Sequence, residues 1–342
     1  MKIRHKNIPV FIPHLGCPNM CVFCNQRSIS GKQSFDRTQV KREIDEALAT
    51  IDRGADVEIA YFGGSFTGID RELMIYLLDL AKSYVDEPRE DRARVSGIRF
   101  STRPDYIDGE IMQILSRYPI KTVELGLQSM SDEVLKRSNR GHTARDAETA
   151  CRLIKEQGYG LIGQMMIGLP GSNLECELET AKKICDMGAD GARIYPTVTF
   201  FGTELANMAQ RGEYEMLSNS EAVMRAKEVY KVFFERGVDV IRIGLSSSDN
   251  LSDPEKVMGG ANHPALGELV VGEVYFDTMC ALCNGMGDLY GKTLTFLVPC
   301  GEVSRAVGQK GINRERIIRR YGAKKVIIKQ DIVNKPTLCV TE

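Results

Sequence analysis

The sequence lacks any apolar run long enough to cross a lipid bilayer, which excludes a membrane-spanning helix. It also lacks an export signal, because the basic start at residues 1–7 leads only into a short apolar strand. Tryptophan is absent too, and this absence excludes nothing. With 43% hydrophobic residues, the 342-residue chain is expected to form a soluble protein with one large and one small domain.

A strong net charge is also missing, since the formal net charge is −1. This average hides an asymmetry: residues 301–342 carry a net charge of +6, whereas residues 1–300 carry −7. The chain has ten cysteines without an export signal. This combination predicts a cytoplasmic protein whose cysteines serve metal or redox chemistry rather than disulfide bonds.

Three of these cysteines, Cys17, Cys21 and Cys24, lie within eight residues near the start. A loop containing proline and asparagine can turn three thiolates toward one point, whereas a helix would scatter them. Soft sulfur ligands select iron–sulfur clusters or zinc. A cubane cluster normally takes four cysteines, and no fourth comes before Cys151, so the spacing predicts one iron left open for a small molecule. A zinc knuckle without its fourth ligand, or thiols without metal, are the alternatives.

The C-x3-C-x2-C spacing, with an aromatic residue before the last cysteine, resembles the radical S-adenosylmethionine (SAM) enzymes. Motifs further along the chain narrow the resemblance to the branch that contains the catalytic subunit of Elongator, a tRNA-modifying enzyme. The resemblance implies that Cys17, Cys21 and Cys24 hold a [4Fe–4S] cluster whose open iron binds SAM. Reductive cleavage of SAM would then yield a 5′-deoxyadenosyl radical, with electrons from a reductant such as flavodoxin or ferredoxin.

Residues 1–245 alternate between apolar strands and amphipathic helices. Six such units predict an α/β fold, a partial (β/α)6 barrel of the radical SAM type, with active-site residues at the carboxyl ends of the strands. The expected strands are 8–13, 57–62, 98–102, 122–127, 161–167 and 192–195.

The resemblance also implies roles for residues that follow these strands. Gly63 and Gly64 would let backbone groups contact the SAM amino group, although a tight turn also explains a glycine pair. Arg103 would pair with the SAM carboxylate, and a salt bridge at the barrel rim is the alternative. Ser101 departs from the family pattern, since related enzymes often have an acidic residue there. His142 is interpreted as a structural or capping residue.

Two further motifs resemble the radical coproporphyrinogen oxidases. Gln128 and Arg140 match positions that bind SAM in those enzymes. Gln164 lies where those enzymes place an aspartate near the SAM ribose, and an amide can also hydrogen-bond a hydroxyl group. Tyr195 would line the substrate side of the barrel mouth, or would pack within the barrel.

Beyond the barrel, residues 246–295 are predicted to be a mostly helical connecting segment, and residues 296–342 a small α+β domain. The connecting segment contains a second C-x2-C pair, Cys280 and Cys283, with Cys300 further on. These three cysteines would suit an auxiliary cluster or a zinc ion. They fit a buried helix face better, because cysteine is common in protein cores.

The final segment has a helix pair joined by a G-x-x-G turn, from Gly308 to Gly311, and flanked by strands. Lys310 and Arg314 belong to a group of cations around this turn. The pattern resembles the KH nucleic-acid-binding module, in which the glycines let the backbone approach phosphate groups. The resemblance implies an RNA-binding domain.

These observations predict a radical SAM enzyme that modifies RNA, in particular tRNA. One alternative is a radical SAM enzyme that acts on a small molecule or cofactor precursor. A second is a nucleic-acid-binding protein whose cluster is structural or senses redox state. The tRNA enzyme of the Elongator branch also carries an acetyltransferase domain, and the sequence leaves no room for one. We therefore do not expect the exact Elongator reaction.

Overall fold

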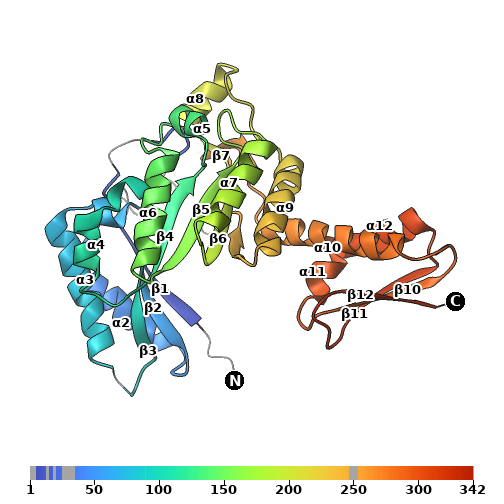
Figure 1. The fold of residues 1–342 in the computed structure, drawn as a ribbon, viewed down its shortest axis with the longest axis horizontal. Helices are drawn as coiled ribbons and strands as arrows, with labels where there is room; N and C mark the ends of the chain where they lie inside the picture. Colours follow the sequence, from blue (N-terminus) through green and yellow to red (C-terminus); the bar gives the residue numbers. More distant parts are fainter. Residues whose placement is uncertain are drawn as a thin grey trace.

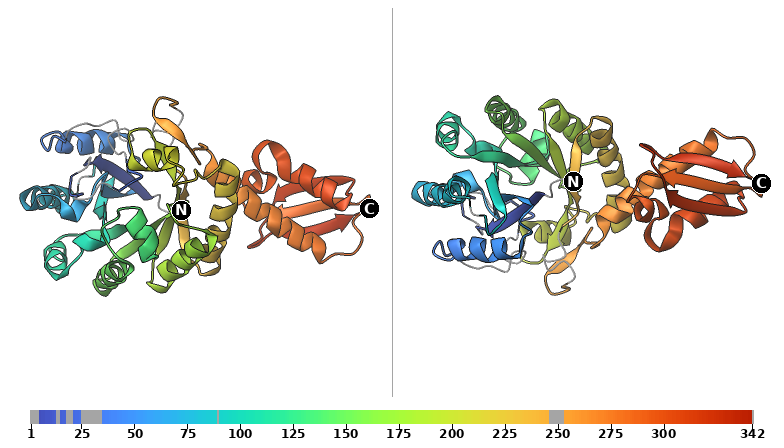
Figure 2. Two further views of the ribbon diagram at one scale, coloured as in Figure 1. Left: turned by 90° about the horizontal axis from the view of Figure 1, so that it is seen from above. Right: turned by 90° about the horizontal axis from the view of Figure 1, so that it is seen from below.

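The larger part of the protein is one sheet of seven parallel strands, β1-β2-β3-β4-β5-β6-β8, which curves into a partial barrel (Figures 1 and 2). The structure, a computed structural model, describes residues 5–12, 15–17, 21–24, 35–88, 90–245 and 253–341. The strands of this sheet are β1 (His5–Phe11), β2 (Asp56–Phe62), β3 (Arg94–Thr102), β4 (Ile120–Gln128), β5 (Gly160–Ile167), β6 (Gly191–Pro196) and β8 (Asp239–Ile243).

Helices cover the convex face of the sheet, as the views along the barrel show (Figure 2). Most begin at a short polar residue whose side chain accepts a hydrogen bond from the first helical turn, for example Thr143, which forms a capping box with Asp146. The helices are α2 (Val40–Thr50), α3 (Arg71–Asp86), α4 (Gly109–Leu115), α5 (Asp132–Arg137), α6 (Ala144–Glu156), α7 (Leu174–Asp186), α8 (Glu204–Gln210) and α9 (Asn219–Glu235).

The alternation of side chains along each strand separates an apolar layer from a polar face, as β4 illustrates. Val123, Leu125 and Leu127 belong to the large core between sheet and helices. Glu124 and Gln128 are buried on the opposite, concave face. Because successive side chains of a strand point to opposite faces, the polar residues of these strands collect inside the barrel.

The predicted partial barrel is confirmed, and its sheet is larger than expected. The seventh strand, β8, pairs in parallel with β6 and extends the sheet beyond the six predicted units. Residues 203–236 form two helices rather than one, because Gly212 has a φ of 73° and Ser218 caps a new helix. The segment predicted to be mostly helical also contains a strand, β9 (Val257–Gly260), paired with β7 (Val198–Phe200), and its residues 246–252 lie outside the described residues.

The C-terminal residues form a second unit around a three-stranded sheet of order β11-β10-β12 (Figure 1). The connection from β10 to its parallel neighbour β11 passes through two helices, whereas β12 pairs antiparallel with β10. Its elements are β10 (Thr293–Val298), α11 (Val303–Val307), α12 (Ile312–Tyr321), β11 (Lys325–Gln330) and β12 (Thr337–Thr341). Strand β12 was not predicted, because its residues alternate between exposed and half-buried and contribute little to the core.

One long helix, α10 (Leu266–Asn284), belongs to both units (Figure 1). Its first turns contribute Leu266 and Val270 to the barrel core. Its last turns contribute apolar side chains, including Cys280 and Cys283, to the core of the C-terminal unit. The second C-x2-C pair therefore lies in an apolar core, where burial raises the pKa of the Cys283 thiol to about 11. None of the helices in the described ranges is both long and apolar enough to span a membrane.

Candidate functional site

The three N-terminal cysteines follow β1 at the carboxyl edge of the barrel. Cys21 is buried, Cys24 is half-buried and Cys17 is exposed. Backbone hydrogen bonds fix the loop on two sides: the Val22 N–H donates to the Ser138 carbonyl (3.1 Å), and the Val22 carbonyl accepts from the Leu205 N–H (2.8 Å). The cysteines are therefore held between the end of β1 and two helices on the far side of the barrel mouth.

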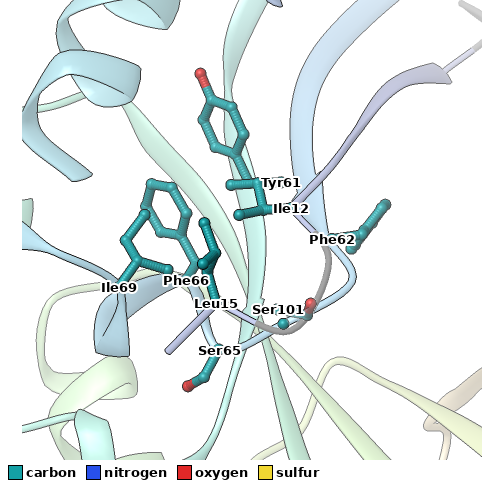
Figure 3. A pocket seen from close by; sticks show the side chains of 9 residues that line it. Ile12, Leu15, Tyr61, Phe62, Ser65, Phe66, Ile69 and Ser101 are labelled. Carbon is teal, nitrogen blue, oxygen red and sulfur yellow. The ribbon is translucent and has the colours of Figure 1, made fainter. Parts of the chain in front are cut away.

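The end of β2 approaches this loop so closely that only glycine fits. A Cβ atom on Gly64 would lie 2.5 Å from the Leu15 carbonyl oxygen, and one on Gly16 would lie 2.2 Å from the Ser65 oxygen. The Ser65 N–H donates to the Leu15 carbonyl (3.2 Å) and joins the two segments. Figure 3 shows this crevice, in which the Tyr61 hydroxyl points away from Ser65. Close packing of the two backbone segments thus explains the glycine pair at the end of β2. The contact of Gly63 and Gly64 with SAM stays a prediction.

Arg140 connects the cysteine loop to the barrel interior. Its Nη1 donates to the Sγ atom of Cys21 (3.4 Å), and its Nη2 donates to the Gly126 carbonyl (2.7 Å). Its Nε is buried and has no hydrogen-bond partner among the described residues. Arg140 therefore places a positive charge directly beside a sulfur atom of the cysteine loop.

Arg103 contacts Arg140 and is almost fully buried. It binds Asp105 bidentately (2.9 and 2.7 Å), and its Nη2 also donates to the Arg140 carbonyl (2.6 Å). Its Nη1 has no hydrogen-bond partner in the described part of the chain. Although the surface of Cys17 is exposed, the surrounding protein removes water from its thiol and raises the pKa of that thiol, and this outweighs the attraction of the thiolate to Arg103 and Arg140.

Gln128 and Gln164 face each other across neighbouring strands. Each amide nitrogen donates to the other amide oxygen, at 2.9 and 2.8 Å. The register between β4 and β5 shifts between Gly126 and Gln128, and Gln128 has a φ of 66°, which is a strained conformation for a side chain of its size. Strain of this kind is typical of functional sites, because the surrounding structure must enforce it.

His142 lies outside the site and contacts the end of β4, where the register with β5 shifts. Its Nε2 lies 3.3 Å from the Leu127 carbonyl oxygen, and the side chain is buried. Burial, and then the charge of Arg140, lower the pKa of His142 to about 4, so the imidazole is neutral at physiological pH. We therefore interpret His142 as a residue that positions the end of β4.

Charged residues that the sequence analysis did not assign line the concave face. Glu58 pairs with Arg99, and Glu124 pairs with Arg193, each at 2.9 Å. Tyr195 lies next to the second pair, 3.5 Å from Arg193 Nη1. In the sequence, these residues can be recognised as charged side chains at alternate positions of strands that are otherwise apolar.

At the C-terminal unit, the G-x-x-G turn joins α11 to α12 and packs on α10. Gly308 and Gly311 have φ values of 72° and 79°, and Lys310 between them has a φ of 55°. Lys310 and Arg314 are exposed, and no described carboxylate lies within ion-pair distance of either. The exposed cations of this face are Lys310, Arg314, Arg319 and Arg320.

Two cations from the predicted group around the turn have structural partners instead. Arg316 pairs with Glu273 and lies 3.5 Å from the centre of the Phe276 ring. Arg305 pairs with Glu302 at 2.8 Å. Because these guanidinium groups hold the C-terminal unit together, fewer cations remain for a polyanion than the sequence indicated.

Residues 11–184 match the Radical SAM superfamily, and residues 189–275 match the Radical_SAM C-terminal domain. The chain belongs to the radical SAM superfamily. Enzymes of this superfamily use a [4Fe–4S] cluster and SAM, and these are the cofactors predicted from the cysteine spacing together with the family resemblance.

Two similar proteins come from methanogenic archaea. Protein MJ0486 of Methanocaldococcus jannaschii is 30% identical over 262 residues, which cover 73% of this chain and 77% of that protein. The tRNA uridine(34) acetyltransferase of Methanocaldococcus infernus is 26% identical over 316 residues, which cover 81% of this chain but only 58% of that enzyme. The chain thus spans less than two thirds of the relative that carries a functional name.

A solved structure supports the fold. The structure of Methanocaldococcus infernus Elp3 with an N-terminal deletion superposes with a TM-score of 0.63 at 23% identity, and the match covers 82% of this chain and 64% of that one. The predicted resemblance to the Elongator branch is confirmed as homology to its radical SAM region.

The residues at the barrel mouth fit the cofactors of this superfamily. Three thiols at one edge would provide sulfur ligands for a [4Fe–4S] cluster. Arg103 Nη1 and Arg140 Nε are buried and have no hydrogen-bond partner among the described residues. Two such donors suit a carboxylate such as that of SAM. Among the described residues, no three histidine, cysteine or acidic side chains converge on a single metal ion, an arrangement that a cubane cluster does not require.

Proposed function

We propose that this protein is a radical SAM enzyme that cleaves SAM reductively and modifies tRNA. One observation carries the proposal: Arg140 donates to Cys21, the buried cluster cysteine, and also reaches Gly126, beside the Gln128–Gln164 pair. The same side chain thus joins a predicted cluster ligand to the strand end that carries Gln128, which is implied to bind SAM. A bound [4Fe–4S] cluster would supply the electron for the reductive cleavage of SAM.

Different residues of the chain would bind different parts of SAM. Arg140 and Arg103 would hold the methionine carboxylate through their buried N–H groups, since guanidinium binds carboxylate bidentately. Gln128 and Gln164 would exchange their mutual hydrogen bonds for the ribose hydroxyl groups. Gly126 would leave room for both groups, because any side chain there would meet Arg140 and Gln128.

Two lines of support point to tRNA. The relative from Methanocaldococcus infernus is named a tRNA uridine(34) acetyltransferase, so a tRNA uridine is the first candidate substrate. The exposed cations Lys310 and Arg314 flank a turn whose glycines allow close backbone approach to phosphates. We propose that residues 296–342 bind the RNA backbone and that the barrel, residues 1–245, performs the chemistry, with residues 246–295 between them.

The test is an anaerobic incubation of the reconstituted protein with SAM, a reductant such as reduced flavodoxin, and total cellular RNA. We expect 5′-deoxyadenosine, and a modified nucleoside detected by mass spectrometry of the digested RNA. The Cys21→Ala variant should form neither product, whereas Cys151→Ala should form both, because Cys151 is buried in the helix layer. Formation of 5′-deoxyadenosine without any change in the RNA would exclude RNA as the substrate.

A further inference from the structure

On the concave face of the barrel, Glu124 and Arg193 form a buried pair with unused hydrogen-bonding capacity. Arg193 Nε lies 2.9 Å from Glu124 Oε1, and the two side chains are only 13% and 9% exposed. Nevertheless, the Arg193 Nε–H and the Glu124 Oε2 atom make no well-directed hydrogen bond with any described residue. A buried acceptor without a partner, beside a buried donor whose short contact is poorly directed, is costly, so this arrangement requires an explanation.

The strand register places this pair on the concave face next to the cofactor-binding end. Glu124 lies opposite Ser101 of β3, and Arg193 lies opposite Gln164 of β5. Gln164 belongs to the amide pair at the barrel mouth. Tyr195, two residues beyond Arg193, carries a hydroxyl that lies 3.5 Å from Arg193 Nη1. A substrate that reaches past the SAM-binding residues would therefore meet this group.

The order of donors and acceptors across the face limits what can bind. Glu124 offers an acceptor in the middle. It interacts electrostatically with Arg193 of β6 on one side and with Arg99 of β3 on the other. Guanidinium groups only donate, and an ionised carboxylate only accepts. The carboxylate acceptor thus lies between two guanidinium donors, of which Arg193 pairs with Glu124 itself and Arg99 pairs with Glu58.

We propose that Glu124, with Arg193 beside it, binds the imide edge of an unpaired uracil base in the RNA substrate. This inference rests on the proposed function and names the base that the barrel accepts. Uracil presents acceptor, donor, acceptor along its O2, N3–H and O4 edge, which complements the protein group. Glu124 Oε2 accepts the N3–H, and Arg193 Nε–H donates to a neighbouring carbonyl. Cytosine has an acceptor at N3, so it would place a lone pair against the carboxylate.

Proteins that recognise RNA sequence commonly read unstacked bases on their pairing edges. An enzyme that reacts at a base must also take that base out of the stack. A polar group inside the barrel, beyond the residues implied to hold SAM, satisfies both requirements. The base would be held by its edge while its reacting atom faces the cofactor.

The test measures binding of synthetic tRNA anticodon stem–loops to the reconstituted protein with SAM, by fluorescence anisotropy. The RNAs differ at position 34 only, carrying uridine, 3-methyluridine, cytidine or guanosine. Wild-type protein should bind the uridine RNA about tenfold more tightly than the 3-methyluridine RNA, which lacks the N3–H. Because this comparison changes the RNA and not the protein, it does not depend on the folding of any variant.

The variant Glu124→Gln should lose this discrimination and should shift in favour of the cytidine RNA, because an amide can donate to N3. The control is Glu177→Gln, which alters an equally buried glutamate paired with Arg225 outside the barrel, and should keep the wild-type ratio. Equal binding of all four RNAs by wild-type protein, or an unchanged ratio in Glu124→Gln, would overturn the inference. So would tighter binding of the cytidine or guanosine RNA by wild-type protein.

Failure of the proposed function has a different signature. If no RNA binds at all, or if the protein forms no 5′-deoxyadenosine from SAM, the enzyme assignment or its RNA substrate is wrong, and the inference falls with it. If RNA binds and SAM is cleaved but the base at position 34 has no effect, the proposed function survives and only the role of Glu124 is refuted.

Discussion

The substitution Gly126→Ala tests the site most directly, because it adds one carbon atom where two implied SAM-binding side chains meet. The new Cβ would lie 2.9 Å from Arg140 Nη2 and 3.0 Å from Gln128 Nε2. Both neighbours are the far ends of flexible side chains, so they would move while the strand stays in place. Arg140 would then lose its 2.7 Å hydrogen bond to the Gly126 carbonyl.

The magnitude follows from that lost bond. A hydrogen bond from a charged donor contributes about 1.5–3 kcal/mol, and mild overpacking costs about 1–3 kcal/mol. We therefore expect the free energy of unfolding to fall by about 1–3 kcal/mol. The displaced Arg140 and Gln128 would also be misplaced for SAM, so the Kd for SAM should rise about 10- to 100-fold, since 1.4 kcal/mol corresponds to a factor of ten.

The assay is equilibrium dialysis of radiolabelled SAM against the anaerobically reconstituted protein, with iron content and urea denaturation measured in parallel. The control is Gly54→Ala, where an added Cβ would meet no atom within 4 Å, so neither affinity nor stability should fall. Iron content should match wild type in both variants. If Gly126→Ala bound SAM as tightly as Gly54→Ala does, Arg140 and Gln128 would not be SAM ligands.

Three further predictions concern other parts of the molecule. Arg314→Ala removes an exposed cation, so RNA affinity should fall uniformly across sequences and the salt slope in a log–log plot should decrease by about 1. Asn313→Ala removes a buried amide that donates to the carbonyls of Gly272 (2.8 Å) and Ala306 (3.1 Å), so urea denaturation should report a loss of about 1–3 kcal/mol. His142 has a pKa of about 4, below its unfolded value of about 6.5, so the unfolded state binds its proton first on acidification. Wild-type protein should therefore lose up to about 3 kcal/mol more stability than His142→Gln as the pH falls from 6.5 to 4.

These variants provide controls for one another. Arg314→Ala should leave stability unchanged, and Asn313→Ala should lower stability although it lies next to Arg314 on α12. A large loss of stability in Arg314→Ala would show that this residue is structural. Parallel stability–pH curves for wild-type protein and His142→Gln would show that the imidazole is not neutral in the folded state.

Local sequence patterns predicted much of the barrel because each strand and helix carries its own periodicity. Apolar stretches of suitable length marked all six predicted strands. The seventh strand, β8, was not predicted as part of the sheet. Its partner β6 lies far away in sequence, across α8 and α9, so only the folded chain reveals the pairing.

The charged pairs inside the barrel were missed for a related reason. Glu124 and Arg193 were visible as charges within apolar strands, but strand-to-strand register decides that they meet. The roles of α10 were missed as well. A helix whose apolar residues are spread around it, with only three acidic residues, gives no sign that its first turns pack on one core and its last turns on another.

The spacing of Cys17, Cys21 and Cys24 narrowed the chemistry to an iron–sulfur cluster or zinc, because soft sulfur ligands select these metals, and the family resemblance then favoured the cluster. Tertiary structure decided which groups surround that loop. Arg140 lies 119 residues from Cys21 in sequence, yet its guanidinium donates to the Cys21 sulfur. Parallel strands bring their carboxyl ends to one edge of the sheet, so residues that are distant in the chain become neighbours only when the barrel forms.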